Sequence, residues 1–142
     1  MEILNDVYHD LLRRDVLVFA GDYRLSGDCD AATVKVGPHY GVFLDIDRIR
    51  TIRQEKEAVV HEWAHIVKGA TYGVDAPASL RQMAEETARR AEIKKLLPFE
   101  KMRGVIKAGC AQIYELSELF NVSEEMVSEA IEYYTGPCGL RF

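Results

Sequence analysis

Hydrophobic spacing alternates between helix and strand periods over the first third of the chain. Apolar residues at helical spacing predict a helix over 5–14, and the apolar run 15–20 predicts a strand directly after it. Two more short strands are predicted at 33–36 and 41–46, joined around a Gly-Pro turn. A small three-stranded sheet is therefore expected ahead of the helical part of the chain.

Two long helical patterns follow the predicted sheet. The first covers 53–70, opens with Thr51 and Gln54 at capping-box spacing, and ends at a glycine. The second covers about 79–97 and stops at Pro98. Its expected core-facing stripe consists of Leu80, Met83, Ala84, Ala88 and Ala91.

The last third of the chain, residues 102–134, has the spacing of three short helices arranged like a helix-turn-helix DNA reader. Between Ile113 and Thr135, however, there are six glutamates and neither lysine nor arginine. Phosphate would repel such a surface. We therefore expect a structural cap or a protein-docking face here, and no direct contact with nucleic acid.

These patterns predict an α+β protein with a three-stranded sheet on a pair of helices and a C-terminal tri-helical cap. Residues 1–98 are expected to form the core and residues 99–142 a helical extension packed on it, as one compact domain. A chain of 142 residues, 48% of them hydrophobic, is long enough to bury such a core.

Charge and hydropathy narrow the expected surroundings of the protein. The formal net charge of -5 disfavours nucleic acid and anionic membrane surfaces as partners. No apolar run approaches the length of a membrane span, and the first residues lack the layout of a signal peptide. A cytoplasmic protein without a membrane partner is expected, and nothing in the composition indicates an oligomeric state.

The sequence His61-Glu62-Trp63-Ala64-His65 lies inside the first long helical pattern. Histidines four residues apart share one helix face and can bind one tetrahedral ion, while Glu62 can reach a water at the open coordination position. A pair of hydrogen-bonded core histidines is the alternative interpretation. Burying two histidines and a glutamate is costly unless each has a partner, and a metal would satisfy all three.

A catalytic zinc ion held by three protein ligands needs one more side chain. Glu85 and Glu86 lie at the two borders of the apolar stripe on the second long helix, and either could supply a carboxylate. Helical angle alone does not choose between them. The other histidines, His9 and His39, have no partner at ligand spacing.

The three cysteines, Cys29, Cys110 and Cys138, form no Cys-x-x-Cys pair and no disulfide framework. We expect them to be reduced. Cys29 lies between two aspartates, which is compatible with a second metal site or with a thiolate that blocks the zinc. A polar loop is the simpler interpretation.

Motifs spread over nearly the whole chain share the layout of one known family. They are 41–45, Thr51 and Glu55 ahead of the histidine motif, 68–72, 85–98, 114–120 and 133–134. Within 85–98, the family pattern of a Glu, an Ala three residues later and a Leu-x-Pro ending is matched by Glu85, Ala88, Leu96 and Pro98. On these residues the chain resembles the ImmA/IrrE family of zinc metallopeptidases, and most closely its short phage and mobile-element branch.

The chain departs from the family pattern at two places. Trp63-Ala64 stands where the family has small apolar residues with a glycine, and Ala91-Glu92 replaces an aromatic-alanine pair. Neither pair is expected to touch a metal ligand, although both could reshape the pocket and its choice of substrate.

The resemblance implies that residues 1–98 are a zincin-like metallopeptidase core whose Zn2+ is held by His61, His65 and Glu85, with Glu86 as the fallback. It also implies an intracellular endopeptidase that cleaves a helix-turn-helix repressor and so derepresses the genes of a phage or mobile element. An acidic enzyme would attract such a basic DNA-binding substrate.

The mechanism expected for such a site assigns a role to each polar residue near the metal. Glu62 would take a proton from a zinc-activated water and pass it to the leaving amine. Tyr72, in the loop after the motif helix, is the candidate donor to the oxyanion. Gly41 to Leu44 is the candidate sheet edge that would pair with an extended substrate.

Two rival functions remain open at this point. In the first, the metal is structural or absent, and the protein acts as a non-catalytic anti-repressor or docking module that binds a regulator without cleaving it. The second is a DNA-binding regulator, which the acidic C-terminal surface disfavours.

Overall fold

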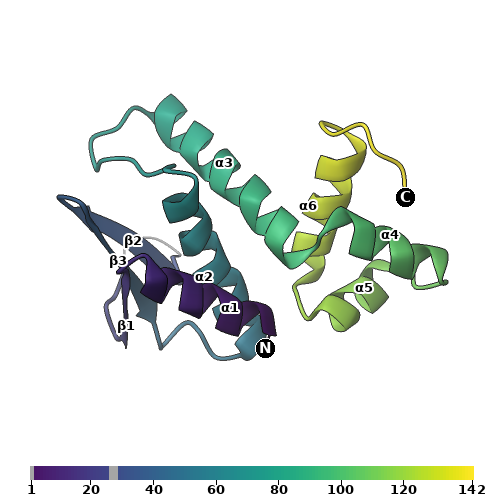
Figure 1. Cartoon of the computed structure of the whole chain (residues 1–142), viewed down its shortest axis with the longest axis horizontal. Helices are drawn as coiled ribbons and strands as arrows, with labels where there is room; N and C mark the ends of the chain where they lie inside the picture. Colours follow the sequence, from purple (N-terminus) through teal and green to yellow (C-terminus); the bar gives the residue numbers. More distant parts are fainter. Residues whose placement is uncertain (1, 26–28) are drawn as a thin grey trace.

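The computed structural model describes residues 2–25 and 29–142, which form a three-stranded sheet and six helices. The predicted α+β class is thereby confirmed (Figure 1). In chain order the elements are α1 (Glu2–Arg13), β1 (Leu17–Gly21), β2 (Ala31–Val36), β3 (His39–Asp45), α2 (Ile52–Val67), α3 (Ala78–Leu96), α4 (Phe99–Lys107), α5 (Ile113–Phe120) and α6 (Glu124–Thr135).

The sheet has the order β1-β3-β2, with β1 parallel and β2 antiparallel to β3. Gly37, with a φ of 61°, begins the two-residue turn between β2 and β3, a position that favours glycine. The prediction that Gly41 to Leu44 is an edge was wrong, because β3 is paired on both sides. Its buried Val42 and Leu44 explain why it takes the central place.

Helix α2 begins at Ile52, one residue before the predicted start, and the predicted cap at Thr51 is present. The Thr51 side chain accepts a hydrogen bond from the Gln54 backbone, and the Gln54 side chain accepts one from the Thr51 backbone, which is a complete capping box. Gly69, with a φ of 61°, ends the helical path. Val59 and Val60 are fully buried in the core that α2 forms with the sheet and α1.

Helices α2 and α3 pack closely through small side chains. Ala64 and Ala88 are fully buried against each other's helices and Ala91 is nearly so, which lets the two backbones approach. Leu80 and Met83 were expected in the same stripe, but they are exposed. Figure 1 shows the reason, since the first turns of α3 extend past the end of α2.

The C-terminal third forms three helices, as predicted. Asn121 takes a left-handed conformation with a φ of 52° at the end of α5, and Ser123 caps α6 by accepting a hydrogen bond from a backbone amide. The buried Lys56 donates to the carbonyl of Phe120 at 2.8 Å, and the Ser123 hydroxyl donates to Glu57 at 2.8 Å. These contacts fasten the C-terminal helices to α2.

In the part of the chain that the structure describes, no helix has the length and apolar character needed to cross a membrane.

Candidate metal centre

Three side chains converge between α2 and α3. His61 and His65 come from the same face of α2, and Glu85 reaches them from α3. Glu85 Oε2 lies 3.0 Å from His61 Nε2 and 3.3 Å from His65 Nε2, and the two Nε2 atoms are 3.2 Å apart. The fold thus brings His61 and His65 together with Glu85, one of the two glutamates that helical geometry alone could not choose between.

The spacing of these three atoms fits one metal ion. A tetrahedral zinc ion with bonds of about 2.0–2.1 Å holds its ligand atoms about 3.3 Å apart. The three observed separations, 3.0, 3.2 and 3.3 Å, lie close to that edge length. The residues present therefore fit a three-ligand zinc site.

Hydrogen bonds fix which ring nitrogen of each histidine faces the centre. His61 Nδ1 lies 2.7 Å from Glu92 Oε2, and His65 Nδ1 lies 2.7 Å from the carbonyl oxygen of Ala70. Because both partners are acceptors, both Nδ1 atoms donate, and a neutral ring then presents a lone pair at Nε2. Two such lone pairs and a carboxylate oxygen converge here. Because these electron-rich atoms repel one another, the arrangement is stable only with a cation or additional protons between them.

The carboxylates around His61 create a strongly negative field. Burial opposes a charge on this ring, but the hydrogen bonds with Glu85 and Glu92 outweigh burial and raise its pKa to about 10. Burial also opposes a charge on His65, but its hydrogen bonds with Glu85 and the Ala70 carbonyl, together with the charge of Glu85, outweigh burial and raise its pKa. The pKa of Glu85 is held well below its usual value by hydrogen bonds from both rings. The same negative field would also favour a metal cation, which would have to displace these protons.

The structure places Glu85, and not Glu86, at the centre. Glu86 is exposed, and its carboxylate accepts a hydrogen bond from Gln82 at 3.2 Å on the outer side of α3. Helical angle could not separate the two because they lie at opposite borders of one stripe. The way α3 packs against α2 selects Glu85.

Glu62 and Tyr72 both lie beside the three converging side chains. Glu62 is buried, and its Oε2 accepts a hydrogen bond from the Thr33 hydroxyl of β2 at 2.7 Å. The Tyr72 hydroxyl donates to Glu85 Oε1 at 2.7 Å, and this bond, together with burial, raises its pKa to about 12. Tyr72 is thus close enough to serve the centre, but in this structure its hydroxyl is hydrogen-bonded to the Glu85 carboxylate.

A cleft runs along β2 past the three converging side chains. It consists of three hollows, of about 450, 170 and 450 Å³, of which the first two share Cys29, Ala31, Glu62 and Glu85. The third lies between β2 and the loop 71–74. The edge strand beside the centre is therefore β2, in place of the predicted Gly41 to Leu44.

The cysteines are all free, as expected. Cys29 is exposed at the cleft, next to residues 26–28, which lie outside the described residues. The centre consists of His61, His65 and Glu85, without a cysteine.

Glu92 is the site residue that sequence reasoning missed. It was expected not to touch a ligand, yet its buried carboxylate contacts His61 directly. A usable signal was present, because Glu92 follows Glu85 by seven residues, which places both on the same helix face. The family pattern concealed this signal, since an aromatic-alanine pair was expected at 91–92.

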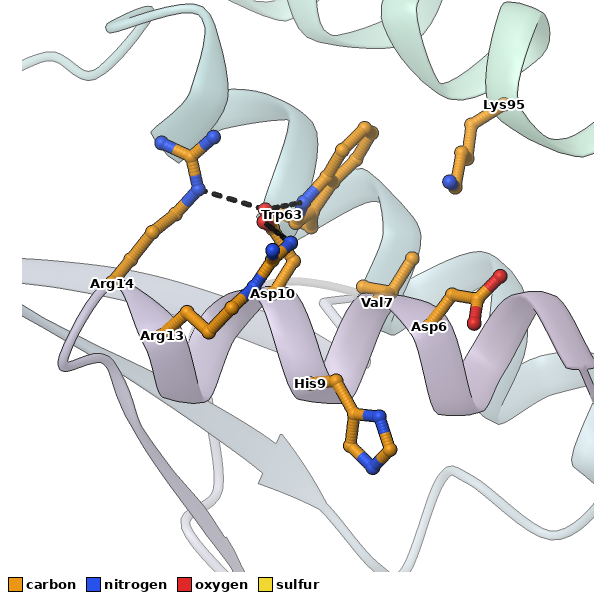
Figure 2. A pocket seen from close by; sticks show the side chains of 8 residues that line it. All are labelled: Asp6, Val7, His9, Asp10, Arg13, Arg14, Trp63 and Lys95. Atoms are coloured by element: carbon orange, nitrogen blue, oxygen red, sulfur yellow. Dashed lines mark hydrogen bonds and ion pairs between the residues drawn. The ribbon is translucent and has the colours of Figure 1, made fainter.

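Trp63 lies on the opposite side of α2 from the histidines. Its indole Nε1 donates to Asp10 of α1 at 2.8 Å, and Asp10 also accepts a hydrogen bond from Arg14 (Figure 2). These residues line a hollow of about 560 Å³ together with Lys95 and His9. Trp63 therefore lines this separate hollow and is not among the residues that line the cleft at the three converging side chains.

Comparison with protein-family models, with curated proteins and with solved structures finds no match. The resemblance to the ImmA/IrrE family accordingly stays a prediction that depends on the residues alone. The convergence of His61, His65 and Glu85 is independent of that resemblance.

Proposed function

We propose that this protein is a zinc-dependent endopeptidase of the ImmA/IrrE type, and that it cleaves a helix-turn-helix repressor in the cytoplasm and so derepresses phage or mobile-element genes. The observation that carries the proposal is the convergence of His61, His65 and Glu85 with a buried glutamate beside them in an open cleft. A structural metal site has no need of that glutamate or that cleft.

The proposed chemistry divides between the metal and the side chains. Zinc, when bound by His61, His65 and Glu85, supplies a Lewis acid that polarises the peptide carbonyl and activates water. Glu62 would take a proton from the water that adds to the peptide carbonyl and pass it to the amide nitrogen as the C–N bond breaks. Because Thr33 holds Glu62 Oε2 at 2.7 Å, we assign the transfer to Oε1.

We further propose that the substrate binds as an extended segment along β2. A peptide paired with this edge would pass Thr33, whose hydroxyl contacts Glu62, and then the exposed Val34 and Val36. The linker that follows a helix-turn-helix domain suits such a groove because it is extended and accessible. The net charge of -5 favours encounter with a basic DNA-binding partner.

The test is co-expression with the helix-turn-helix regulator encoded beside this gene. Wild type should shorten the regulator, whereas Glu62→Gln should retain zinc and lose cleavage by more than about 1,000-fold, as expected for a general base. The matched control is Glu86→Gln, which makes the same chemical change on the outer side of α3 and should cleave normally. Zinc content is measured on each purified protein.

The same experiment separates the proposal from its main rival. If Glu62→Gln retains zinc and still relieves repression with the regulator intact, the protein is a docking module without catalysis. If wild type contains no zinc and cleaves nothing, the metallopeptidase proposal is wrong.

A further inference from the structure

We propose that Glu92 is a positioning residue for His61, and that Arg89 and Glu129 extend its support to α6, so that docking of the C-terminal helices tunes metal affinity. We call Glu92, Arg89 and Glu129 the α3–α6 bridge. The inference depends on the proposed metal site, but it does not depend on peptidase activity.

The bridge is a continuous series of charged contacts. Glu92 Oε2 lies 2.7 Å from His61 Nδ1 and 3.2 Å from Arg89 Nη1. Arg89 Nε in turn donates to the Glu129 carboxylate on α6. A ligand of the centre is thereby joined through side chains alone to an element of the C-terminal cap.

Burial makes Glu92 sensitive to the loss of its partners. Its side chain is 1% exposed, and its Oε1 has no hydrogen-bond partner among the described residues. A buried carboxylate is costly unless it is paired, so the contacts with His61 and Arg89 compensate the burial of Glu92. Any movement of Arg89 therefore alters the acceptor that orients the His61 ring and strengthens it as a ligand.

Glu129 is not needed merely to hold α6 in place. Other contacts already dock the C-terminal helices, including Lys56 with the Phe120 carbonyl, Ser123 with Glu57, and the Tyr134 hydroxyl with the Leu97 carbonyl. Glu129 contributes its contact with Arg89 beside these. Its removal can therefore break the bridge while α6 stays docked.

The coupling acts in both directions. If docking of α6 raises metal affinity, metal binding must stabilise the docking of α6 by the same free energy. Zinc should therefore slow hydrogen exchange at backbone amides of α6, although, among the described residues, no hydrogen bond or ion pair joins α6 directly to His61, His65 or Glu85. This measurement needs no substrate.

The experiment compares Zn2+ affinity by chelator competition, and Co2+ absorption spectra, in wild type, Glu92→Gln, Glu129→Gln and the double variant. Glu92→Gln should weaken zinc binding by about 10- to 100-fold, the usual effect of removing a ligand's outer partner. Glu129→Gln should weaken it by about threefold, and only while Glu92 is present. The matched control is Glu132→Gln, an exposed glutamate on the same helix.

The results distinguish failure of the proposed metal site from failure of the α3–α6 bridge. Absence of zinc binding by wild type would reject the proposed metal site itself. Binding by wild type with equal affinities for Glu129→Gln and Glu132→Gln would reject the bridge, and so would a Glu129→Gln effect of the same size with and without Glu92.

A second variant covers the case in which Glu129→Gln does not fold. Arg89→Lys keeps the positive charge but cannot reach Glu92 and Glu129 at once, so it should also weaken zinc binding and abolish the zinc-dependent slowing of exchange in α6. Wild-type affinity and wild-type protection in this variant would overturn the proposal.

Discussion

The two histidines of the centre are held by different chemistry. His61 is oriented by the carboxylate of Glu92, which continues through side chains to α6. His65 is oriented by a backbone carbonyl, that of Ala70, in the turn that follows α2. The orientation of His61 thus depends on which residue stands at position 92, whereas that of His65 depends on the path of the backbone.

This difference determines which histidine can respond to changes elsewhere in the molecule. A single substitution at Glu92 can remove the carboxylate that contacts His61, so the orientation of His61 can respond to movement of α6. The carbonyl behind His65 is present whatever residue occupies position 70, so the orientation of His65 changes only if the turn itself is disturbed. We infer that His65 provides the fixed end of the centre and His61 the adjustable end.

The largest expected effect on zinc affinity comes from changing Glu85, whose carboxylate contacts both histidines. Glu85 Oε2 lies within 3.3 Å of both Nε2 atoms, so Glu85→Gln removes the negative charge shared by the two rings. Zinc affinity should fall by more than the roughly 100-fold that loss of an outer partner costs. Isothermal titration calorimetry measures it, with Glu86→Gln as the control. Equal affinities in the two variants would remove Glu85 from the centre.

The second prediction concerns the stability of the metal-free protein against pH. Folding raises the pKa of His61 from 6.5 to about 10. Its contribution to stability is therefore complete below pH 6.5 and is lost as the pH rises toward 10. Glu85 acts in another range, because its lowered pKa matters only as the pH falls below its ordinary 4.5.

We therefore expect the thermal midpoint in EDTA to fall by several degrees between pH 6.5 and pH 10. Saturating zinc should remove most of that decline, because metal replaces the protons. Glu92→Gln should make the decline shallower, since Glu92 helps to raise the pKa of the adjustable ligand. A flat profile in EDTA would contradict the electrostatic description of the His61 end.

The helix that carries both histidines could largely be predicted from sequence, whereas the groups that orient them, the Ala70 carbonyl and the Glu92 carboxylate, could not. The capping box of Thr51 and Gln54 and the common face of His61 and His65 depend on residues three or four positions apart. Such local chemistry can be read directly. The choice of Glu85 over Glu86 required the family pattern, because it is made by the packing of α3.

The errors all arose where distant segments decide the outcome. Strand order put β3 in the centre of the sheet, and hydrophobic pattern alone does not specify which strand of a hairpin takes a third partner. Leu80 and Met83 have core spacing, but α3 extends past its neighbour there. Glu92 looked like a departure from a pattern until its contact with His61 gave it a role.

The third prediction tests the fixed end through its backbone. Gly69 has a φ of 61°, and the next residue supplies the carbonyl that binds His65. Gly69→Ala should cost about 1–2 kcal/mol of strain in this conformation and weaken zinc binding by about fivefold as the carbonyl shifts. The matched control is Gly73→Ala in the same loop, where an added Cβ meets no atom within 4 Å. If both variants bind zinc like wild type, the turn does not orient His65.

The smallest effect on zinc affinity is expected at Tyr72, whose hydroxyl donates to Glu85 Oε1 at 2.7 Å. Its side chain is 43% exposed, so water can replace the hydroxyl in Tyr72→Phe, and affinity should change by less than about threefold. Chelator competition measures this, with the exposed Tyr114→Phe on α5 as the control. A loss as large as that of Gly69→Ala would make Tyr72 part of the fixed support of the metal. A small loss leaves the hydroxyl available to a substrate oxygen, as its proposed role as oxyanion donor requires.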